Sequence, residues 1–185
     1  MGRIIKRYKS TIYGPYRVAY LRSGGLTALL LVGYIVVSGL FGRPLHAPEN
    51  YGIDIILFVP IFAFTLTYRN ALPDHKVTFK ELILLGLGIA ATASLGYGLF
   101  VWLYAGVLNP EQCSLFAEGR IALMVDPEAA DAEAQVAIDR VRHYSAFDWG
   151  FIAFFRSLVM GSFIAFFAAI VFRTEKGQII SKTKK

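Results

Sequence analysis

The chain has 185 residues, of which 56% are hydrophobic and 15% are aromatic. This content exceeds that of ordinary soluble domains and indicates an integral membrane protein. A net charge of +6 would suit a nucleic-acid-binding protein, but the basic residues flank long apolar runs, which argues against nucleic acid as a partner. The single cysteine, Cys113, excludes an intrachain disulfide and a cysteine-based metal site.

Two apolar runs in the first half of the chain predict membrane-spanning helices. The first covers residues 23–42, and the second covers residues 53–68, with Asp54 at its entrance and Pro60 inside. About 20 residues cross the hydrocarbon core as a helix, so the first run suffices and the second is short. The leader, residues 1–22, carries six basic and no acidic side chains, which favours contact with an anionic membrane surface.

Two longer apolar runs follow in the second half. Residues 82–108 come directly after Thr78 and Glu81, whose spacing is that of a capping box. Residues 149–172 begin with a tryptophan suited to the membrane interface and lead into the basic tail 173–185. We therefore expect an all-α integral membrane protein with four transmembrane helices in a domain that covers residues 23–172.

Charged residues are sorted along the chain. Residues 109–148 hold eight of the thirteen acidic residues but only three of the nineteen Lys and Arg residues. Loops rich in Lys and Arg stay on the cytoplasmic side of a bilayer, so the leader, the loop near residue 75 and the tail are predicted to be cytoplasmic. The acidic segment is then external, and both termini face the cytoplasm.

Small residues recur at every fourth position in the third and fourth predicted spans. Helices associate in lipid through close backbone approach, so such rows predict tight packing of these two spans. The rows are Gly86, Ala90, Ser94 and Gly98, with Gly88, Thr92 and Gly96 beside them, in the third span, and Ala153, Ser157, Gly161, Ala165 and Ala169 in the fourth. The residues alone leave open whether the rows meet each other or a foreign helix.

The acidic segment 109–148 predicts an amphipathic helical hairpin. Asn109 before Pro110 and Asp126 before Pro127 each offer an N-cap side chain followed by proline at the first helical position. An alanine-rich apolar stripe of the second helix comprises Ala130, Ala134, Ala137, Val141 and Tyr144. This stripe would lie against the bundle, the membrane interface or another protein, and a solvated connector is the alternative.

Arg156 lies about two turns inside the fourth span, where an unpaired guanidinium is costly. It must reach the interface or find a partner, for which Asp54 is the first candidate and Asp148 the second. We expect a structural ion pair or snorkelling. Contact with an anionic lipid headgroup or a substrate carboxylate is the functional alternative.

The sequence holds no pattern for catalysis or for a cofactor. His46, His75 and His143 fall in three different connections, so no pair has the spacing of metal ligands. Asp139 and His143 are one helical turn apart, but no nucleophile accompanies them, and such a pair is more often a surface contact than a catalytic dyad. Phosphate-binding loops, nucleophile elbows and dinucleotide fingerprints are missing as well. We expect a non-enzymatic protein with no metal and no cofactor.

Three stretches carry a resemblance to a known family. They are residues 77–81 running into the glycine-bearing third span, residues 108–111 at its exit, and the hairpin of roughly forty residues before an aromatic last span. From about Leu26 to Phe172 the chain resembles a family of uncharacterised four-helix inner-membrane proteins, a domain of unknown function found mainly in Bacteroidota. The resemblance implies a bacterial inner-membrane protein and transfers no catalytic residue.

These observations lead to two hypotheses about function. The first is an accessory or structural subunit that stabilises a larger membrane protein complex, with membrane lipids and other membrane subunits as partners. The second is a small transporter or lipid-binding protein that assists envelope biogenesis, in which Arg156 and Asp54 face a polar cavity. A membrane-embedded enzyme would need clustered titratable groups inside the spans, and Arg156 is the one that lies well within a span.

Overall fold

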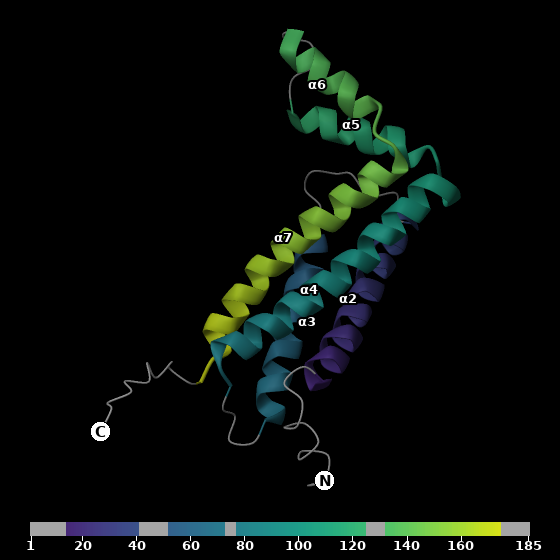
Figure 1. Cartoon of the computed structure of the whole chain (residues 1–185). Coiled ribbons are helices and arrows are strands. Elements are labelled where there is room, and N and C mark those ends of the chain that lie inside the picture. Colours follow the sequence, from purple (N-terminus) through teal and green to yellow (C-terminus); the bar gives the residue numbers. More distant parts are fainter. Residues whose placement is uncertain (1–13, 41–51, 73–76, 125–131, 175–185) are drawn as a thin grey trace, which may run out of the picture.

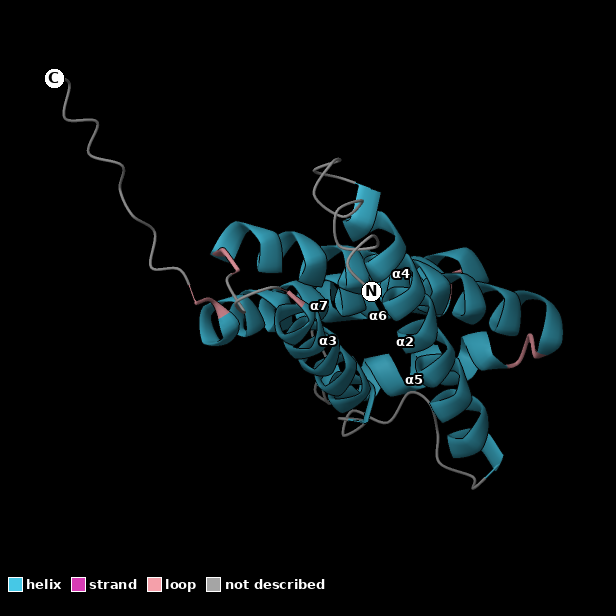
Figure 2. Ribbon diagram, turned by 90° about the horizontal axis from the view of Figure 1, so that it is seen from below, coloured by secondary structure: helices cyan, strands magenta, loops and turns pink. Residues whose placement is uncertain are grey.

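The computed structural model describes residues 14–40, 52–72, 77–124 and 132–174. All regular structure in these segments is helical (Figures 1 and 2). The elements in chain order are α2 (Gly14–Leu40), α3 (Gly52–Ala71), α4 (Phe79–Leu103), the π-helical turn η2 (Tyr104–Leu108), α5 (Gln112–Met124), α6 (Ala132–Arg142) and α7 (Ala146–Phe172). The prediction of an all-α fold is therefore confirmed.

Four of the helices are long and apolar enough to cross a membrane, namely α2, α3, α4 together with η2, and α7. The chain is thus a multi-pass membrane protein. These helices form one bundle in which α4 packs most extensively against α7 and next against α2, while α3 packs against α7 and α2. The helices α5 and α6 lie beyond one end of the bundle, here called the hairpin end, and α2 begins and α7 ends at the opposite, terminal end (Figure 1).

The small-residue rows of α4 and α7 face each other. A Cβ placed on Gly86 would lie 2.6 Å from the Cβ of Ala165, and one on Gly161 would lie 2.7 Å from the Cβ of Ala90. Nearer the hairpin end, a Cβ on Gly98 would lie 2.8 Å from the carbonyl oxygen of Gly150. Only glycine permits this approach, because any side chain would overlap the opposite helix. The question that the sequence left open is settled: the two rows meet each other.

The second stripe of α4 receives α2. A Cβ on Gly88 would collide with the ring of Tyr20, and one on Gly96 would lie 2.7 Å from the Cβ of Ala28. Thr92 fits against Gly24 between them, and its hydroxyl donates to the Gly88 carbonyl oxygen one turn back at 2.9 Å. The helix α4 therefore presents one row of small residues to each of its two main neighbours.

Large apolar side chains lie mostly on the outside of the bundle. On α7 the exposed residues include Phe151, Phe155, Phe163, Phe166 and Phe167, while Ala165, Ala168 and Ala169 are buried. This arrangement suits a bundle surrounded by lipid, since hydrocarbon solvates large apolar side chains and only small residues let the backbones approach.

The terminal end of the α4/α7 pair is closed by hydrogen bonds. Thr78 caps α4: its hydroxyl accepts from the Glu81 amide, and the Glu81 carboxylate accepts from the Thr78 amide at 2.9 Å. The predicted capping box is thus confirmed. Beside it, the Val77 amide donates to the Thr174 hydroxyl at 2.9 Å, and the Thr174 amide donates to the Val77 carbonyl oxygen at 3.2 Å. These bonds tie the start of α4 to the residues that follow α7.

Two helices begin at other residues than the apolar runs and caps indicate. The first helix begins at Gly14, inside the segment interpreted as a leader, and Pro15 lies in its first turn, where proline is tolerated. Asn109 follows η2, and its carbonyl oxygen accepts from the Gln112 amide at 3.1 Å. Its amide donates to the Tyr104 carbonyl oxygen at 2.7 Å and closes the π-helical turn, so that α5 begins three residues later, at Gln112. The predicted start at Asp126 and Pro127 lies outside the described residues.

Candidate functional site

Asp54 and Arg156 approach each other across the α3/α7 contact. Asp54 is the third residue of α3, and Arg156 is the eleventh of α7. The guanidinium Nη2 of Arg156 lies 3.6 Å from the carboxylate Oδ2 of Asp54. The structure therefore brings together the two charged residues that the sequence pairs. It does not bring Asp148 into this contact.

The ion pair is incomplete. At 3.6 Å the contact is longer than a charge-assisted hydrogen bond, and it engages one nitrogen of a group that has five N–H donors. The Arg156 side chain is 57% exposed and the Asp54 side chain 25% exposed. Tyr97, which is buried on α4, lies within electrostatic range of both charges. Side chains from three helices thus lie near one another. We call Asp54, Tyr97 and Arg156 together the polar cluster.

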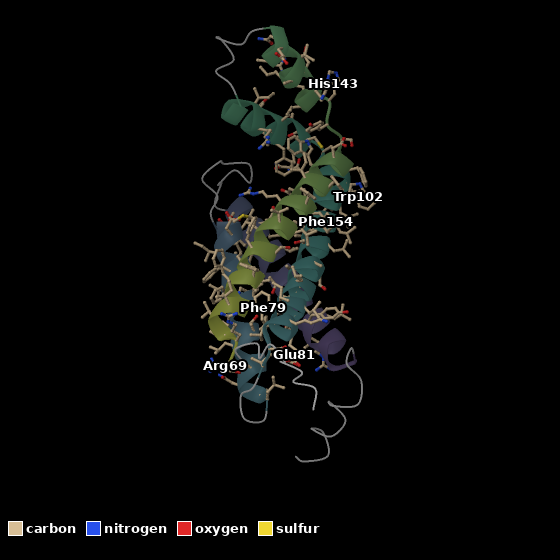
Figure 3. The ribbon with its side chains drawn as sticks, turned by 60° about the vertical axis from the view of Figure 1, so that its left-hand side comes forward. Arg69, Phe79, Glu81, Trp102, His143 and Phe154 are labelled. Carbon is tan, nitrogen blue, oxygen red and sulfur yellow. The ribbon has the colours of Figure 1, made fainter. Side chains whose placement is uncertain are left out.

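The helices α4 and α7 extend beyond the polar cluster toward the hairpin end. Phe154 packs against Gly98, and Ala146 packs against Gly106, so both helices continue together past the level of Arg156. Figure 3 places Phe154 and Trp102 in this half of the bundle, and Arg69, Phe79 and Glu81 near the opposite end. The helix α3, by contrast, begins at Gly52, next to Tyr34 of α2. The cluster therefore lies at the end of α3 but well inside α7.

The helices α5 and α6 pack on each other above this extension. Ile138 and Val141 of α6 are buried with Ala117 and Ile121 of α5, which makes a small apolar core. Ile138 is missing from the stripe predicted for α6, where the alanines drew attention to a neighbouring face. Most charged side chains described in this region are exposed, including Glu118, Arg120 and Glu133.

Trp149 joins the helical hairpin to the bundle. Its ring lies 5.5 Å from that of Phe116 on α5 and 5.5 Å from that of Tyr144, which precedes α7. The tryptophan is buried, and its indole N–H has no hydrogen-bond partner among the described residues. Three aromatic rings therefore connect α5, α7 and the α6–α7 connection, and they form a contact between the hairpin and the bundle.

A second capping box, which the sequence analysis missed, starts α7. The Ser145 amide donates to the Asp148 carboxylate at 2.8 Å, and the Ser145 hydroxyl accepts from the Asp148 amide at 3.4 Å. The spacing of Ser145 and Asp148 is the same as that of Thr78 and Glu81, so the sequence pattern predicts this capping box as well. This cap occupies Asp148 and explains why it does not pair with Arg156.

Asp139 of α6 and His143, which follows α6, show no contact between their side chains. The Nδ1 of His143 lies 2.7 Å from the backbone carbonyl oxygen of Asp139, whereas the Asp139 carboxylate lies 3.5 Å from Arg142. His46 and His75 lie outside the described residues. Within the described segments, no three His, Cys, Asp or Glu side chains are grouped in a way that would hold a metal ion.

Cys113 lies on α5, next to η2 at the end of the bundle. Its thiol is 3.8 Å from the carbonyl oxygen of Ala105 in η2. Partial burial raises the pKa of the Cys113 thiol above its usual value, because the thiolate is poorly solvated there. The thiol is thus less reactive at neutral pH than a freely exposed one.

A comparison with known protein families matches the part of the chain that contains the four membrane-spanning helices and the hairpin. A family model described as a protein of unknown function, DUF4199, matches residues 22–174. The chain belongs to this family. The match contains both ends of the α4/α7 pair, the polar cluster and the helices α5 and α6. No curated protein and no solved structure gives a significant match to the chain.

Proposed function

We propose that this DUF4199 protein is a non-catalytic accessory subunit of a larger membrane protein complex. The observation that carries the proposal is the hairpin, which the aromatic contact of Trp149 with Phe116 and Tyr144 attaches to the end of the bundle. A rigid surface binds a partner at a lower entropic cost than a mobile one. The packing of α5 on α6 leaves their charged faces and Val136, which is 62% exposed, free to contact a partner.

The arrangement of the bundle also supports an accessory role. The two rows of small residues on α4 are both used within the chain, so partners in the membrane would meet the large side chains of the outer surface. This outer surface is apolar, as contact with lipid or with an apolar helix of a partner requires. The hairpin then provides specificity through charge, because eight of the thirteen acidic residues lie in segment 109–148.

We propose further that the protein resides in a bacterial inner membrane, with the hairpin outside and both termini in the cytoplasm. The distribution of Lys and Arg supports this orientation, since sixteen of the nineteen lie outside segment 109–148. The bundle is compatible with it, because α2 begins and α7 ends at the same end (Figure 1). We also propose that the family occurs mainly in Bacteroidota.

The alternative, a small transporter or lipid-binding protein for envelope biogenesis, draws support from the polar cluster. A transporter needs a polar route across the whole membrane, whereas Asp54 and Arg156 lie together near the hairpin end of α3. The cluster therefore favours the binding of a lipid over the transport of a solute.

Purification in mild detergent, followed by mass spectrometry, tests the accessory role. We expect a larger complex of fixed stoichiometry. A photo-cross-linking residue at Val136 should give one defined adduct, whereas the same residue at Leu29, which is exposed on α2, should give none of that mass. A single monodisperse protein without an adduct at Val136 would contradict the proposal.

A further inference from the structure

Asp54 is the one charged partner of the Arg156 guanidinium among the described residues. Within the described residues its charged partner is one carboxylate oxygen at 3.6 Å, and more than half of its side chain is exposed. Of the acidic side chains on α2, α3, α4 and α7, Glu81 and Asp148 are engaged in helix caps, which leaves Asp54 alone. Unpaired N–H donors are costly at a lipid-facing surface. Among the described residues, nothing else satisfies the remaining N–H donors of Arg156, and the polar headgroup of a lipid would do so.

The depth of the polar cluster identifies the region of the bilayer that supplies this group. The 20 residues of α3 span about 30 Å, which equals the hydrocarbon thickness, so the first residues of α3 mark one edge of the hydrocarbon core. Asp54 lies at this edge. The Arg156 side chain starts deeper in α7 but leans toward the helix N-terminus, as side chains on helices do, and that terminus is at the hairpin end. Its guanidinium thus lies beside Asp54, on the side of Arg156 that faces the hairpin-end surface of the bilayer.

We propose that Arg156 binds the phosphate group of a phospholipid in the leaflet at the hairpin end, while Asp54 holds the guanidinium in position. The planar guanidinium fork matches two phosphate oxygens, and this explains an arginine at a site where a lysine would supply only a point charge. Asp54 uses one side of the fork and leaves the rest available.

Neighbouring residues suit the acyl chains of such a lipid. Val159 and Met160 lie one turn deeper than Arg156 on α7, and Phe58 lies one turn deeper than Asp54 on α3. All three side chains are exposed. They continue from the polar cluster toward the bilayer centre, which is the direction that acyl chains take from a phosphate at the membrane edge.

A simple ion pair and a phosphate site respond differently to substitution. If the two residues only neutralise each other, Asp54→Asn and Arg156→Gln disturb the protein equally, and neither changes lipid retention. If Arg156 binds phosphate, Arg156→Gln loses the lipid, whereas Asp54→Asn keeps it. The double variant D54N/R156Q leaves no unpaired charge and should also lose the lipid, so a folding defect caused by an isolated Asp54 is kept apart from a binding defect.

Native mass spectrometry of the full chain in detergent measures this difference. The probe is palmitoyl-oleoyl phosphatidylglycerol, with palmitoyl-oleoyl glycerol as the analogue without phosphate. We expect one tightly retained phospholipid in the wild-type protein and an affinity about tenfold lower in R156Q and in the double variant. R156K should restore part of the affinity. The control R142Q removes an exposed arginine that lies 3.5 Å from Asp139 on the hairpin, and it should bind like the wild type.

Three outcomes would overturn the proposal. Equal retention by R156Q and the wild type would show that Arg156 does not bind the lipid. Equal retention of the analogue without phosphate would show that the phosphate is not recognised. Displacement of the lipid by inorganic phosphate at millimolar concentration would assign the site to a soluble anion instead of a headgroup. The accessory role is tested separately, because its cross-linking position lies on α6, away from the polar cluster.

Discussion

The bundle and the hairpin solve the packing problem in opposite ways. Between α4 and α7, small residues such as Gly86 and Ala165 are inside, and large phenylalanines are outside. Between α5 and α6, the larger Ile138 and Val141 are inside, and charged side chains are outside. One chain therefore changes its packing rule at the end of the bundle.

This difference in packing indicates where the surroundings of the chain change from lipid to water. In water, burial of large apolar side chains drives association, whereas in lipid the same side chains gain nothing from burial and close backbone contact takes over. The change occurs at the Trp149 contact, where an aromatic side chain with one polar atom meets both regions. Substitutions on either side should consequently obey different rules.

The largest effect is expected for Gly86→Leu in the bundle. Its new side chain would overlap Ala165, whose Cα lies 3.1 Å from the position of a Cβ, so neither backbone can yield. We expect a loss of about 3 kcal/mol or more, and with it the loss of monodisperse protein in size-exclusion chromatography. The control is Gly33→Leu, where a Cβ meets nothing within 4 Å and the larger side chain would face lipid. Equal yields of the two variants would contradict the claim that close backbone contact holds the bundle together.

The next largest effect is expected for Ile138→Ala in the hairpin. Ile138 is 2% exposed, so its truncation leaves a cavity and should destabilise the packing of α5 on α6 by about 2 to 3 kcal/mol. Hydrogen–deuterium exchange should show faster exchange in α5 and α6 with unchanged protection in α4 and α7. Val136→Ala, at an exposed position of the same helix, is the matched control. Faster exchange throughout the bundle would show that the two regions do not fold by separate rules.

A smaller effect is expected at the boundary between the two regions. Ser145→Ala removes the hydroxyl that caps α7 and should lower stability by about 1 kcal/mol, seen as a reduced melting temperature. Thr67→Ala serves as the control, because the Thr67 hydroxyl bonds within its own helix, to Ala63, and caps nothing. A larger drop for Thr67→Ala than for Ser145→Ala would refute the importance of the cap.

The smallest effect concerns the reactivity of Cys113. The thiolate is the reactive form, and the raised pKa lowers its population at neutral pH, so labelling by a membrane-impermeant maleimide should be slow and should accelerate above the usual thiol pKa. Cys113→Ser combined with Ser114→Cys moves the thiol to an exposed position and should react faster. Labelling of intact cells also tests the proposed orientation. Reaction only after permeabilisation would place the hairpin in the cytoplasm.

Patterns of local origin predicted much of this fold. The four apolar runs gave the spans, the Thr78 and Glu81 spacing gave the cap of α4, and the rows of small residues gave the α4/α7 contact. The pairing of Arg156 with Asp54 followed from the cost of a lone charge in a membrane. Each of these depends on a few residues within one helix or on a single strong energetic demand.

What the sequence did not reveal depends on contacts between distant segments. The π-helical turn that ends at Asn109 arises where α4 meets the start of α7, and proline at position 110 resembled a helix start on local grounds. The hydrogen bonds between Val77 and Thr174 join residues that are 97 positions apart, and no local sequence pattern predicts them. Ile138 was overlooked because alanines at helical spacing outlined a neighbouring face of the same helix.

The pairing of α4 with α7, which the hydrogen bonds between Val77 and Thr174 close at the terminal end, also has a consequence for biogenesis. Because α4 finds its main partner in α7, its glycine row stays uncovered while the hairpin is synthesised. During this interval α2 is the neighbour that can hold α4. The protein should thus assemble in two stages, α2 with α4 first, and α7 closing the bundle only when Thr174 has left the ribosome.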